Sequence, residues 1–483
     1  MNALQPDNPN RVRKGSPVRK SPCRVCVVLG GLLLWPVSLF LLLGASEAQA
    51  WRSKDPYVAP PEPPPRPVYK VHPDYAHYVE EGGVIIAAYR GPGGDVMIPS
   101  EIEGKPVIGI GKSAFVWQEG ITGVSIPDSV THLEEEALAS PDPATISIGS
   151  GLIRIGDGAL RDSSAIKVDE ANPAFSSRDG VLFDKAQTTL IQFPRYKSGP
   201  YTIPDSVTAI GDHAFFNASG LTSLVIPASV THVGEFAFAG CRSLTNVVIG
   251  SGVVSIGVSA FKECTALRSI VVDEGNPFFS SLGGVLFDKG QSMLIVYPEG
   301  RSGPYLIPDS VTHIDSYAFA NHKGLTSVKA GRKVAHIWPG TFAGCPGLTA
   351  ITVDEGNPTY SHIDGVLFNK AQTVLILYPE GRSGPYIVPD GTIRIGDHAF
   401  EGSRRLTRVT IAPSVTHIGS AAFRHCVRLR RVYFLGNAPA HGYNVFDSSP
   451  PIIRYPVGAS GWDQNYAGRP IVGWDPEPVS SND

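Results

Sequence analysis

Four cysteines offer possible thiol chemistry, and each lies three residues after a phenylalanine that recurs along the chain: Cys241, Cys264, Cys345 and Cys426. Only Cys241 and Cys264 fall on neighbouring repeats, where stacked strands would hold their Cβ atoms about 4.8 Å apart. A disulfide prefers a Cβ separation of about 3.5–4.5 Å. We therefore predict four free, buried thiols that pack as small apolar side chains. Cys23 and Cys26 have CxxC spacing, but they lie at the edge of a segment that we expect to be removed.

Five histidines occupy one repeat position beside apolar residues and are predicted to face solvent: His132, His232, His313, His336 and His417. Only His313 and His336 would stack on adjacent repeats, which gives two ligands where zinc takes three or four. The chain contains no G-x-S-x-G, Walker, G-x-G-x-x-G or H-E-x-x-H motif. No column of Asp, Lys and Arg recurs from repeat to repeat either. We therefore expect no metal, no cofactor and no catalytic residue.

Tyrosine and a basic residue recur in three related segments that we predict to be protruding loops. Tyrosine and arginine are among the side chains most enriched at binding hot spots. The candidate ligand-binding residues are Tyr196, Lys197, Tyr201, Tyr297, Arg301, Tyr305, Tyr378, Arg382 and Tyr386. The alternative is that these side chains only pack each loop onto the body of the protein.

An Asp-Glu-x-Asn-Pro segment begins at Asp169, at Asp273 and at Asp354, and opens each of three inserted blocks of about 35 residues. Clustered oxygen ligands suit calcium. No D-x-D-x-[DN]-G loop accompanies these segments, and turns capped by Asp and Asn side chains explain the same residues. Two apolar runs around a polar turn follow each segment and predict a β-hairpin.

The element that positions all these residues is a repeat. Ser/Thr-Val-x-x-Ile, a small residue and Ala-Phe recur, and the closing residue falls mostly 23 residues after the previous one. Such a period indicates one structural unit stacked many times. The predicted core ladder includes Phe215, Phe238, Phe261, Phe319, Phe342, Phe400 and Phe423.

The phrases IPDSVTHI, IGDHAF and FAGCRSLTNVVI resemble the BspA-type leucine-rich repeat, a 23-residue variant of exported bacterial proteins. The resemblance implies a mainly-β repeat solenoid, a right-handed superhelix of about ten rungs (single repeat turns) with three inserted hairpin blocks. It also implies an N-terminal cap over residues 78–115, repeats over 116–435 and a C-terminal cap and tail over 436–483. The better-known members look like adhesins and surface proteins.

The N-terminal segment predicts export. Six Lys/Arg precede an apolar run over residues 25–44, and Ala48-Gln49-Ala50 favours cleavage between Ala50 and Trp51. The alternative is a retained anchor, because a run of 20 residues is about long enough to span a bilayer. A proline-rich linker over residues 51–77 then separates the signal peptide (residues 1–50) from the folded body.

Charge excludes one class of partner. The net charge is −3, and the chain after residue 50 carries 35 Lys/Arg against 42 Asp/Glu, so we expect no nucleic-acid partner. We expect a non-catalytic secreted or cell-surface protein that mediates adhesion by binding an extracellular or envelope protein or glycan. The alternatives are a membrane-anchored structural envelope component, contacting the membrane only through residues 25–44, and a β-helix enzyme that acts on polysaccharides.

Overall fold

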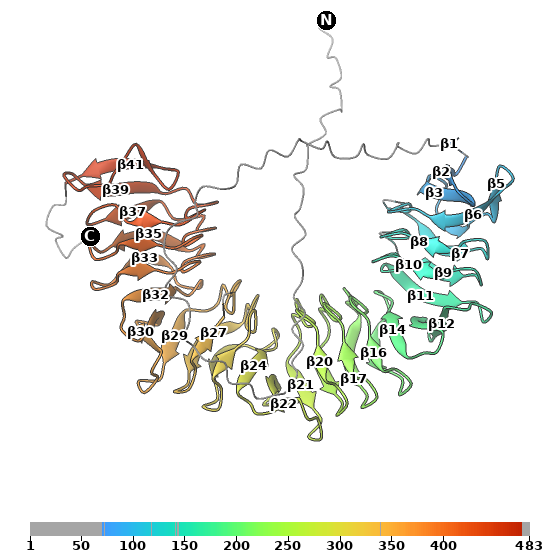
Figure 1. The fold of residues 1–483 in the computed structure, drawn as a ribbon, viewed down its shortest axis with the longest axis horizontal. Helices are drawn as coiled ribbons and strands as arrows, with labels where there is room; N and C mark the ends of the chain where they lie inside the picture. Colours follow the sequence, from blue (N-terminus) through green and yellow to red (C-terminus); the bar gives the residue numbers. More distant parts are fainter. Residues whose placement is uncertain are drawn as a thin grey trace, which may run out of the picture. The chain divides into compact units, whose positions relative to one another are not determined.

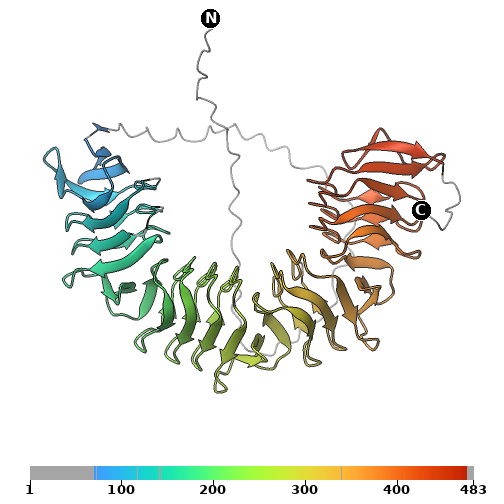
Figure 2. The same ribbon diagram turned by 180° about the vertical axis from the view of Figure 1, so that it is seen from behind.

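The computed structural model describes residues 70–475, except residues 72, 117, 141, 143 and 339, within one compact unit that spans Arg66–Asp483. The described residues form 41 strands and no helix. Figures 1 and 2 show these strands following one another in a continuous curved stack. The predicted class, a mainly-β leucine-rich-repeat solenoid, is therefore confirmed.

Each rung contributes one longer strand to the solenoid, and these strands form four sheets in which they pair in parallel. The first sheet contains β4 (Gly94–Met97), β7 (Ile121–Ile126), β9 (Ala144–Ile148) and β11 (Ser163–Val168). The second contains β15 (Gly199–Thr202), β17 (Leu221–Ile226), β19 (Asn246–Ile249) and β21 (Ser269–Val272). The third contains β25 (Gly303–Leu306), β27 (Leu325–Ala330) and β29 (Ala350–Val353). The fourth contains β33 (Gly384–Ile387), β35 (Leu406–Ile411), β37 (Arg431–Phe434), β39 (Ile452–Pro456) and β41 (Arg469–Trp474).

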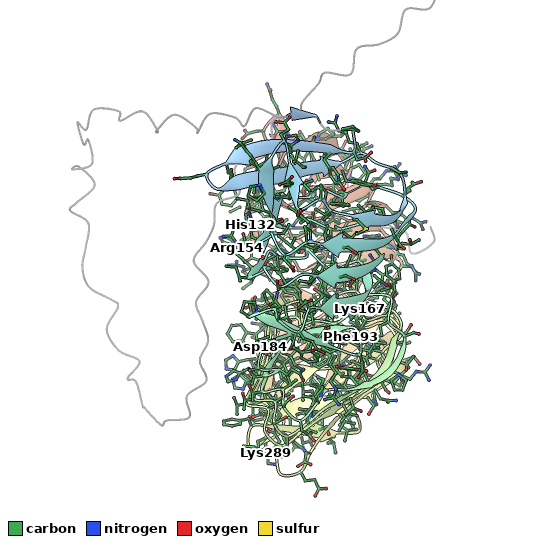
Figure 3. The ribbon with its side chains drawn as sticks, turned by 90° about the vertical axis from the view of Figure 1, so that its right-hand side faces the viewer. His132, Arg154, Lys167, Asp184, Phe193 and Lys289 are labelled. Carbon is green, nitrogen blue, oxygen red and sulfur yellow. The ribbon has the colours of Figure 1, made fainter. Side chains whose placement is uncertain are left out.

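Short strands form a second set of ladders: β8 (His132–Leu133), β10 (Arg154–Ile155), β16 (Ala209–Ile210), β18 (His232–Val233), β20 (Ser255–Ile256), β26 (His313–Ile314), β28 (His336–Ile337), β34 (Arg394–Ile395), β36 (His417–Ile418) and β38 (Ala440–His441). Figure 3 labels His132 and Arg154, which are paired neighbours in one such ladder. Both sets of sheets are interrupted at the three inserted blocks.

Each inserted block contains three antiparallel strands. The blocks comprise β12 (Phe175–Arg178), β13 (Val181–Asp184) and β14 (Thr189–Gln192); β22 (Phe279–Leu282), β23 (Val285–Asp288) and β24 (Met293–Val296); and β30 (Tyr360–Ile363), β31 (Val366–Asn369) and β32 (Val374–Leu377). The third strand of each block then pairs in parallel with the next short strand of the solenoid. The predicted hairpins are therefore present, and each leads directly back into the stack.

Further strands cover the two ends of the described stack. At the N-terminal end these are β1 (Lys70–Val71), β2 (Tyr75–Glu80), β3 (Gly83–Tyr89), β5 (Glu101–Ile102) and β6 (Lys105–Ile110). The β2–β3 hairpin begins three residues before the predicted cap. At the other end, β40 (Asn465–Tyr466) pairs antiparallel with β41. Such ends protect apolar rungs and strand edges.

The core is a ladder of aromatic rings. All seven predicted phenylalanines are at most 5% exposed. Phe215 and Phe238 lie 5.2 Å apart between ring centroids, and Phe400 and Phe423 lie 4.7 Å apart. Ring stacking adds to the burial of large apolar surface. The ladder therefore joins successive rungs into one core.

The predicted number of rungs was too low. The four sheets contain sixteen longer strands, where the sequence predicted about ten rungs. The inserted blocks complete additional rungs, because Phe193, Tyr297 and Tyr378 occupy the phenylalanine position and pack against Phe215, Phe319 and Phe400. The caps add the remaining strands. The segments predicted to be protruding loops are consequently part of the solenoid, and their Gly-Pro-Tyr stretches are strands β15, β25 and β33.

The signal peptide, the cleavage point between Ala50 and Trp51, the possible anchor over residues 25–44 and nearly all of the 51–77 linker lie outside the described residues. Within the described part of the chain, no helix has the length and hydropathy needed to span a membrane.

Candidate binding crevice

A shortened turn in the first inserted block creates a crevice. Leu190 pairs with Ile210, and the amide of Phe193 donates to the carbonyl of Ala214 at 2.7 Å. On the normal rung, four residues separate Ile210 from Phe215, the equivalent of Phe193. On the rung of the inserted block, only two residues, Ile191 and Gln192, separate Leu190 from Phe193. The rung of the inserted block therefore has no full turn to fill the space between the turns of the two rungs on either side of it.

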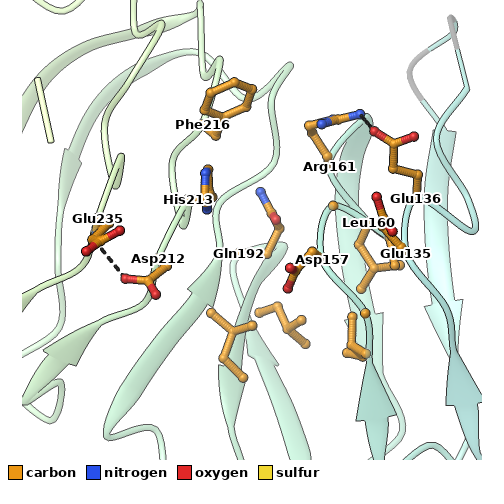
Figure 4. Close-up of a pocket in the computed structure, with 16 residues that line it drawn as sticks. Glu135, Glu136, Asp157, Leu160, Arg161, Gln192, Asp212, His213, Phe216 and Glu235 are labelled. Atoms are coloured by element: carbon orange, nitrogen blue, oxygen red, sulfur yellow. Dashed lines mark hydrogen bonds and ion pairs between the residues drawn. The ribbon is translucent and has the colours of Figure 1, made fainter. Parts of the chain in front are cut away.

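The space left between the flanking turns is a crevice of about 360 Å³. One wall comes from the turn after β10 and includes Asp157, Leu160 and Arg161. The opposite wall comes from the turn after β16 and includes Asp212, His213 and Phe216. Figure 4 shows the side chain of Gln192 between these walls. Apolar side chains, among them Leu182 and Ile191, complete the lining.

Some polar groups of the crevice already form hydrogen bonds within the described part of the chain, and others do not. Arg161 Nη2 donates to Glu136 Oε1 at 2.8 Å, and Asp212 Oδ1 accepts from the backbone N–H of Glu235 at 2.7 Å. Gln192 Nε2 donates to the carbonyl of Phe193 at 3.0 Å. Among the described residues, the carboxylate of Asp157 has no hydrogen bond or ion pair. The crevice thus presents carboxylate, amide and guanidinium groups together.

Planar rings form one wall. The ring of His213 stacks on Phe236 with centroids 5.4 Å apart and meets Phe216 edge-on at 5.6 Å. His213 has a φ of 58°, a left-handed conformation that is uncommon for residues other than glycine. The same turn position has positive φ in other rungs, including Tyr317 and His398. The repeat turn therefore imposes this conformation, and the packed rings hold the wall in place.

The asparagine of each Asp-Glu-x-Asn-Pro segment is buried and fully hydrogen-bonded. Asn276 Nδ2 donates to the carbonyls of Gly250 and Val253 at 3.0 and 2.9 Å, and its Oδ1 accepts from two backbone amides at 2.8 Å each. Asn172 and Asn357 form the same four bonds. Because the amide oxygen already accepts two hydrogen bonds, the structure favours the turn interpretation over calcium. No group of three or more potential metal ligands occurs among the described residues.

The basic residues of the predicted ligand-binding loops contact their own inserted hairpins. Lys197 Nζ donates to the carbonyl of Asp179 at 2.8 Å, and Arg301 Nη1 donates to the carbonyl of Gly283 at 2.6 Å. Arg382 makes the corresponding bond to the carbonyl of Asp364. Arg301 and Arg382 also lie over the rings of Tyr297 and Tyr378. Ligand binding by these side chains stays a prediction, and any ligand would compete with these contacts.

The tyrosines of these segments differ in exposure. Tyr297 and Tyr378 are 3% and 2% exposed, so their rings belong to the core ladder. Tyr201, Tyr305 and Tyr386 are half-buried and pack against that ladder. Burial raises the pKa of Tyr201 to about 12. Tyr196 is the most accessible of the candidates, with 39% exposure.

Sequence reasoning missed Glu299 and Glu380, which precede Arg301 and Arg382 by two residues. Glu299 Oε1 accepts from the backbone N–H of Glu263 at 2.8 Å, and Glu380 Oε1 accepts from Gly344 at 2.7 Å. Burial raises the pKa of each carboxyl to about 7. In the first block Arg195 occupies this position and pairs with Asp162 at 2.6 Å. A carboxyl facing a backbone amide leaves no motif in the sequence that could have revealed it.

The cysteine prediction is confirmed: Cys241, Cys264, Cys345 and Cys426 are free and buried. Each Sγ donates to the carbonyl of a repeat phenylalanine 26 residues earlier, at 2.9–3.1 Å. Burial raises the pKa of Cys241, Cys345 and Cys426 to about 12.

The histidine prediction holds in part. His232, His336 and His417 are exposed, but His132 and His313 are half-buried. Burial is the main reason why the pKa of His132 is lowered. His313 and His336 stack with ring centroids 4.6 Å apart, as their position on adjacent rungs predicted.

Comparison with known proteins identifies the repeat. The family model described as BspA type leucine rich repeat region, in six copies, matches residues 100–198, 193–289, 305–376 and 386–456. The chain belongs to the BspA-type leucine-rich repeat family. Residues 290–304 and 377–385 fall between the matched regions of this BspA-type protein and contain Glu299 and Glu380. These carboxyls therefore lie outside the matched repeat regions.

Solved structures include similar bacterial proteins. A leucine rich cell surface protein from Faecalibacterium prausnitzii is 26% identical over 77% of this chain and 96% of its own, with a TM-score of 0.47. The pneumococcal vaccine antigen PcpA is 16% identical over 81% of this chain and 94% of its own, with a TM-score of 0.37. A leucine-rich repeat protein from Bacteroides ovatus is 18% identical over 80% and 94%, with a TM-score of 0.29. No curated protein matches the chain.

Proposed function

We propose that this BspA-type protein is a non-catalytic interaction protein that acts outside the cytoplasm and binds an extracellular or envelope protein or glycan. The observation that carries the proposal is a row of outward-facing valines on the second sheet. Val225, Val248 and Val271 are paired neighbours on β17, β19 and β21. They are 38%, 39% and 49% exposed. A contiguous apolar patch on a soluble protein is typical of an interaction surface.

The raised carboxyl pKa values have a structural explanation that fits a non-catalytic role. A carboxyl with a pKa near 7 is a common sign of acid–base catalysis. Glu299 and Glu380 instead use one oxygen to accept from the backbone of the preceding rung. Each carboxyl thus joins an inserted block to its neighbour. The family membership supports the same interpretation.

A binding assay tests the function. The purified protein is passed over immobilised extracellular-matrix proteins, cell-wall material and a second sample of itself. We expect saturable binding to one external material, weakened by Val248→Lys because the substitution places a charge in the valine row. The exposed substitution Lys289→Ala, on an inserted hairpin, is the matched control. Self-association without external binding would favour a structural envelope component instead.

The place of action is tested separately. The sequence of the N-terminus leads us to propose export, with cleavage before Trp51. Mass spectrometry of the protein from the culture medium and from the membrane fraction determines the mature N-terminus. A chain that begins at Trp51 in the medium or at the cell surface supports the proposal. An intact N-terminus in the membrane fraction would instead support the anchored alternative.

A further inference from the structure

We infer that the crevice beside the first inserted block binds a short segment of a neutral glycan. The inference rests on the proposed function and names the ligand class for one site. The volume of about 360 Å³ falls within the range of about 300–1,000 Å³ that is usual for small-ligand sites. The crevice lies between the turns of the two rungs that flank the shortened rung of the first inserted block.

The hydrogen-bonding groups of the crevice match sugar hydroxyls. A hydroxyl both donates and accepts, so a sugar needs both kinds of partner close together. Asp157 and Asp212 supply carboxylate oxygens, Arg161 supplies guanidinium N–H groups, and Gln192 supplies an amide oxygen. Figure 4 shows these side chains on the two walls with Gln192 between them. Planar groups with two adjacent polar atoms can bind two neighbouring hydroxyls at once.

The rings supply the other half of sugar recognition. A sugar ring has a face of C–H groups that packs against aromatic surface, while its hydroxyls point outward. His213 and Phe216 present planar surface on one wall, and Phe236 supports His213 from behind at 5.4 Å. A wall held by ring contacts loses little conformational entropy when a ligand binds.

The charges exclude an acidic ligand. Carboxylates line both walls and would repel a sulfate, phosphate or carboxylate on an acidic glycan; they belong to Glu135, Glu136, Asp157, Asp212 and Glu235. Among the described residues of the lining, Arg161 is the one Lys or Arg, and its pairing with Glu136 at 2.8 Å leaves most of this negative charge uncompensated. A neutral glycan meets no such repulsion, and its hydroxyls can donate to the carboxylate oxygens.

The second inserted block provides an internal comparison. Val296 occupies the position of Gln192, because each lies two residues after a strand residue that pairs with the next rung. Val258 occupies the position of Asp157 in the preceding turn and is 64% exposed. The first block thus has polar groups where the second has apolar side chains, although both share the shortened turn.

The test exchanges these residues. The purified protein is applied to an array of neutral, acidic and amino-group-bearing oligosaccharides, and affinities for the neutral glycans that bind are then measured by titration calorimetry. The combined variant Gln192→Val and Asp157→Val should lower the affinity at least about tenfold. The melting temperature should stay unchanged, because the second block tolerates valine at both positions. Val258→Asp, in the second block, is the matched control and should bind as the parent protein does.

The outcomes distinguish the crevice from the general proposal. Unchanged binding of cell-wall or matrix material by the double variant, with no neutral glycan bound, would overturn the crevice assignment and leave the proposed function standing. Binding of an oligolysine peptide that weakens with salt and depends on Asp157 would also overturn it, because the ligand would then be cationic. A protein that binds none of the materials would contradict both proposals.

Discussion

The first and second inserted blocks share several hydrogen bonds but use different polar groups where they meet the preceding rung. In both blocks a buried asparagine holds the entry to the hairpin, and a basic side chain, Lys197 or Arg301, donates to a carbonyl of the hairpin turn. Where the block meets the preceding rung, the first uses an ion pair between Arg195 and Asp162. The second uses the carboxyl of Glu299 against a backbone N–H. The bonds that the two blocks share hold each block in place, and the contacts of Arg195 and Glu299 differ between them.

The largest expected effect comes from breaking what the blocks share. Asn276→Ala removes four hydrogen bonds at a buried residue. The carbonyl of Val253 and two backbone amides lose their partner, and the carbonyl of Gly250 keeps only a long bond of 3.5 Å from the amide of Val253. Each buried group left unsatisfied costs about 1–3 kcal/mol, with partial relaxation. We expect a loss of roughly 4 kcal/mol in the free energy of unfolding of the region, measured by urea denaturation.

The exposed Asn246, on β19, is the control for this substitution. Asn246→Ala should change the free energy of unfolding by less than about 0.5 kcal/mol. The equivalent change in the first block, Asn172→Ala, should cost as much as Asn276→Ala, since its four bonds are the same. A small effect at either asparagine would show that the shared bonds do not hold the blocks in place.

The next effect separates the two blocks. Arg195→Ala leaves the carboxylate of Asp162, whose side chain is only 10% exposed, without its closest cationic partner. Breaking a well-buried ion pair costs about 3–5 kcal/mol, and the partial exposure of Arg195 reduces this. We expect about 2 kcal/mol at pH 7, measured by urea denaturation. Arg195→Ala combined with Asp162→Asn should recover part of the loss, and failure to recover would exclude the ion pair as its cause.

Glu299 and Glu380 predict a pH dependence that the first block lacks. Burial raises the pKa of both carboxyls to about 7, above the value of 4.5 expected in the unfolded chain. The folded state therefore binds protons more tightly than the unfolded chain does, and protonation stabilises the fold. This stabilisation is complete below about pH 4.5 and is lost as the pH rises through about 7. Solvent screening limits it to roughly 1–2 kcal/mol per group.

Substitution isolates this dependence. Glu299→Gln removes the titrating group, so the fall in the free energy of unfolding between pH 4.5 and 7.5 should become smaller by about 1 kcal/mol. The groups that face Glu299 are Glu263, Lys262 and Lys323, and none of them is altered. Asp315 has a pKa raised by burial as well and contributes a background of the same sign. An unchanged pH profile for Glu299→Gln would assign the dependence to other groups.

The sequence predicted the parts of the fold that repeat and missed the parts that occur once or differ. A period of 23 residues identified the solenoid, the phenylalanine ladder and the cysteine positions. It did not identify Tyr297 and Tyr378 as members of the ladder, because their rungs are short and lack the Ala-Phe phrase. The crevice was invisible for the same physical reason. It results from two missing residues in a turn, and its walls come from rungs whose turns are separated by a whole inserted block.

The smallest expected effect concerns a position that the rungs share. Ser449 occupies the cysteine position of a later rung, and its Oγ donates to the carbonyl of Phe423 at 2.6 Å. The thiol of Cys426 makes the corresponding bond to Phe400 at 3.0 Å. Cys426→Ser should therefore change the free energy of unfolding by less than about 1 kcal/mol, whereas Cys426→Ala loses the donor and should cost about 1–2 kcal/mol.

Thiol reactivity checks the same position by another route. The raised pKa of Cys426, about 12, keeps the thiol protonated, and its burial excludes reagent. The four solenoid thiols should stay unreactive towards a thiol reagent in the native protein at pH 8 and react only after denaturation. A thiol that reacts in the native state would show that the rung opens locally at that point.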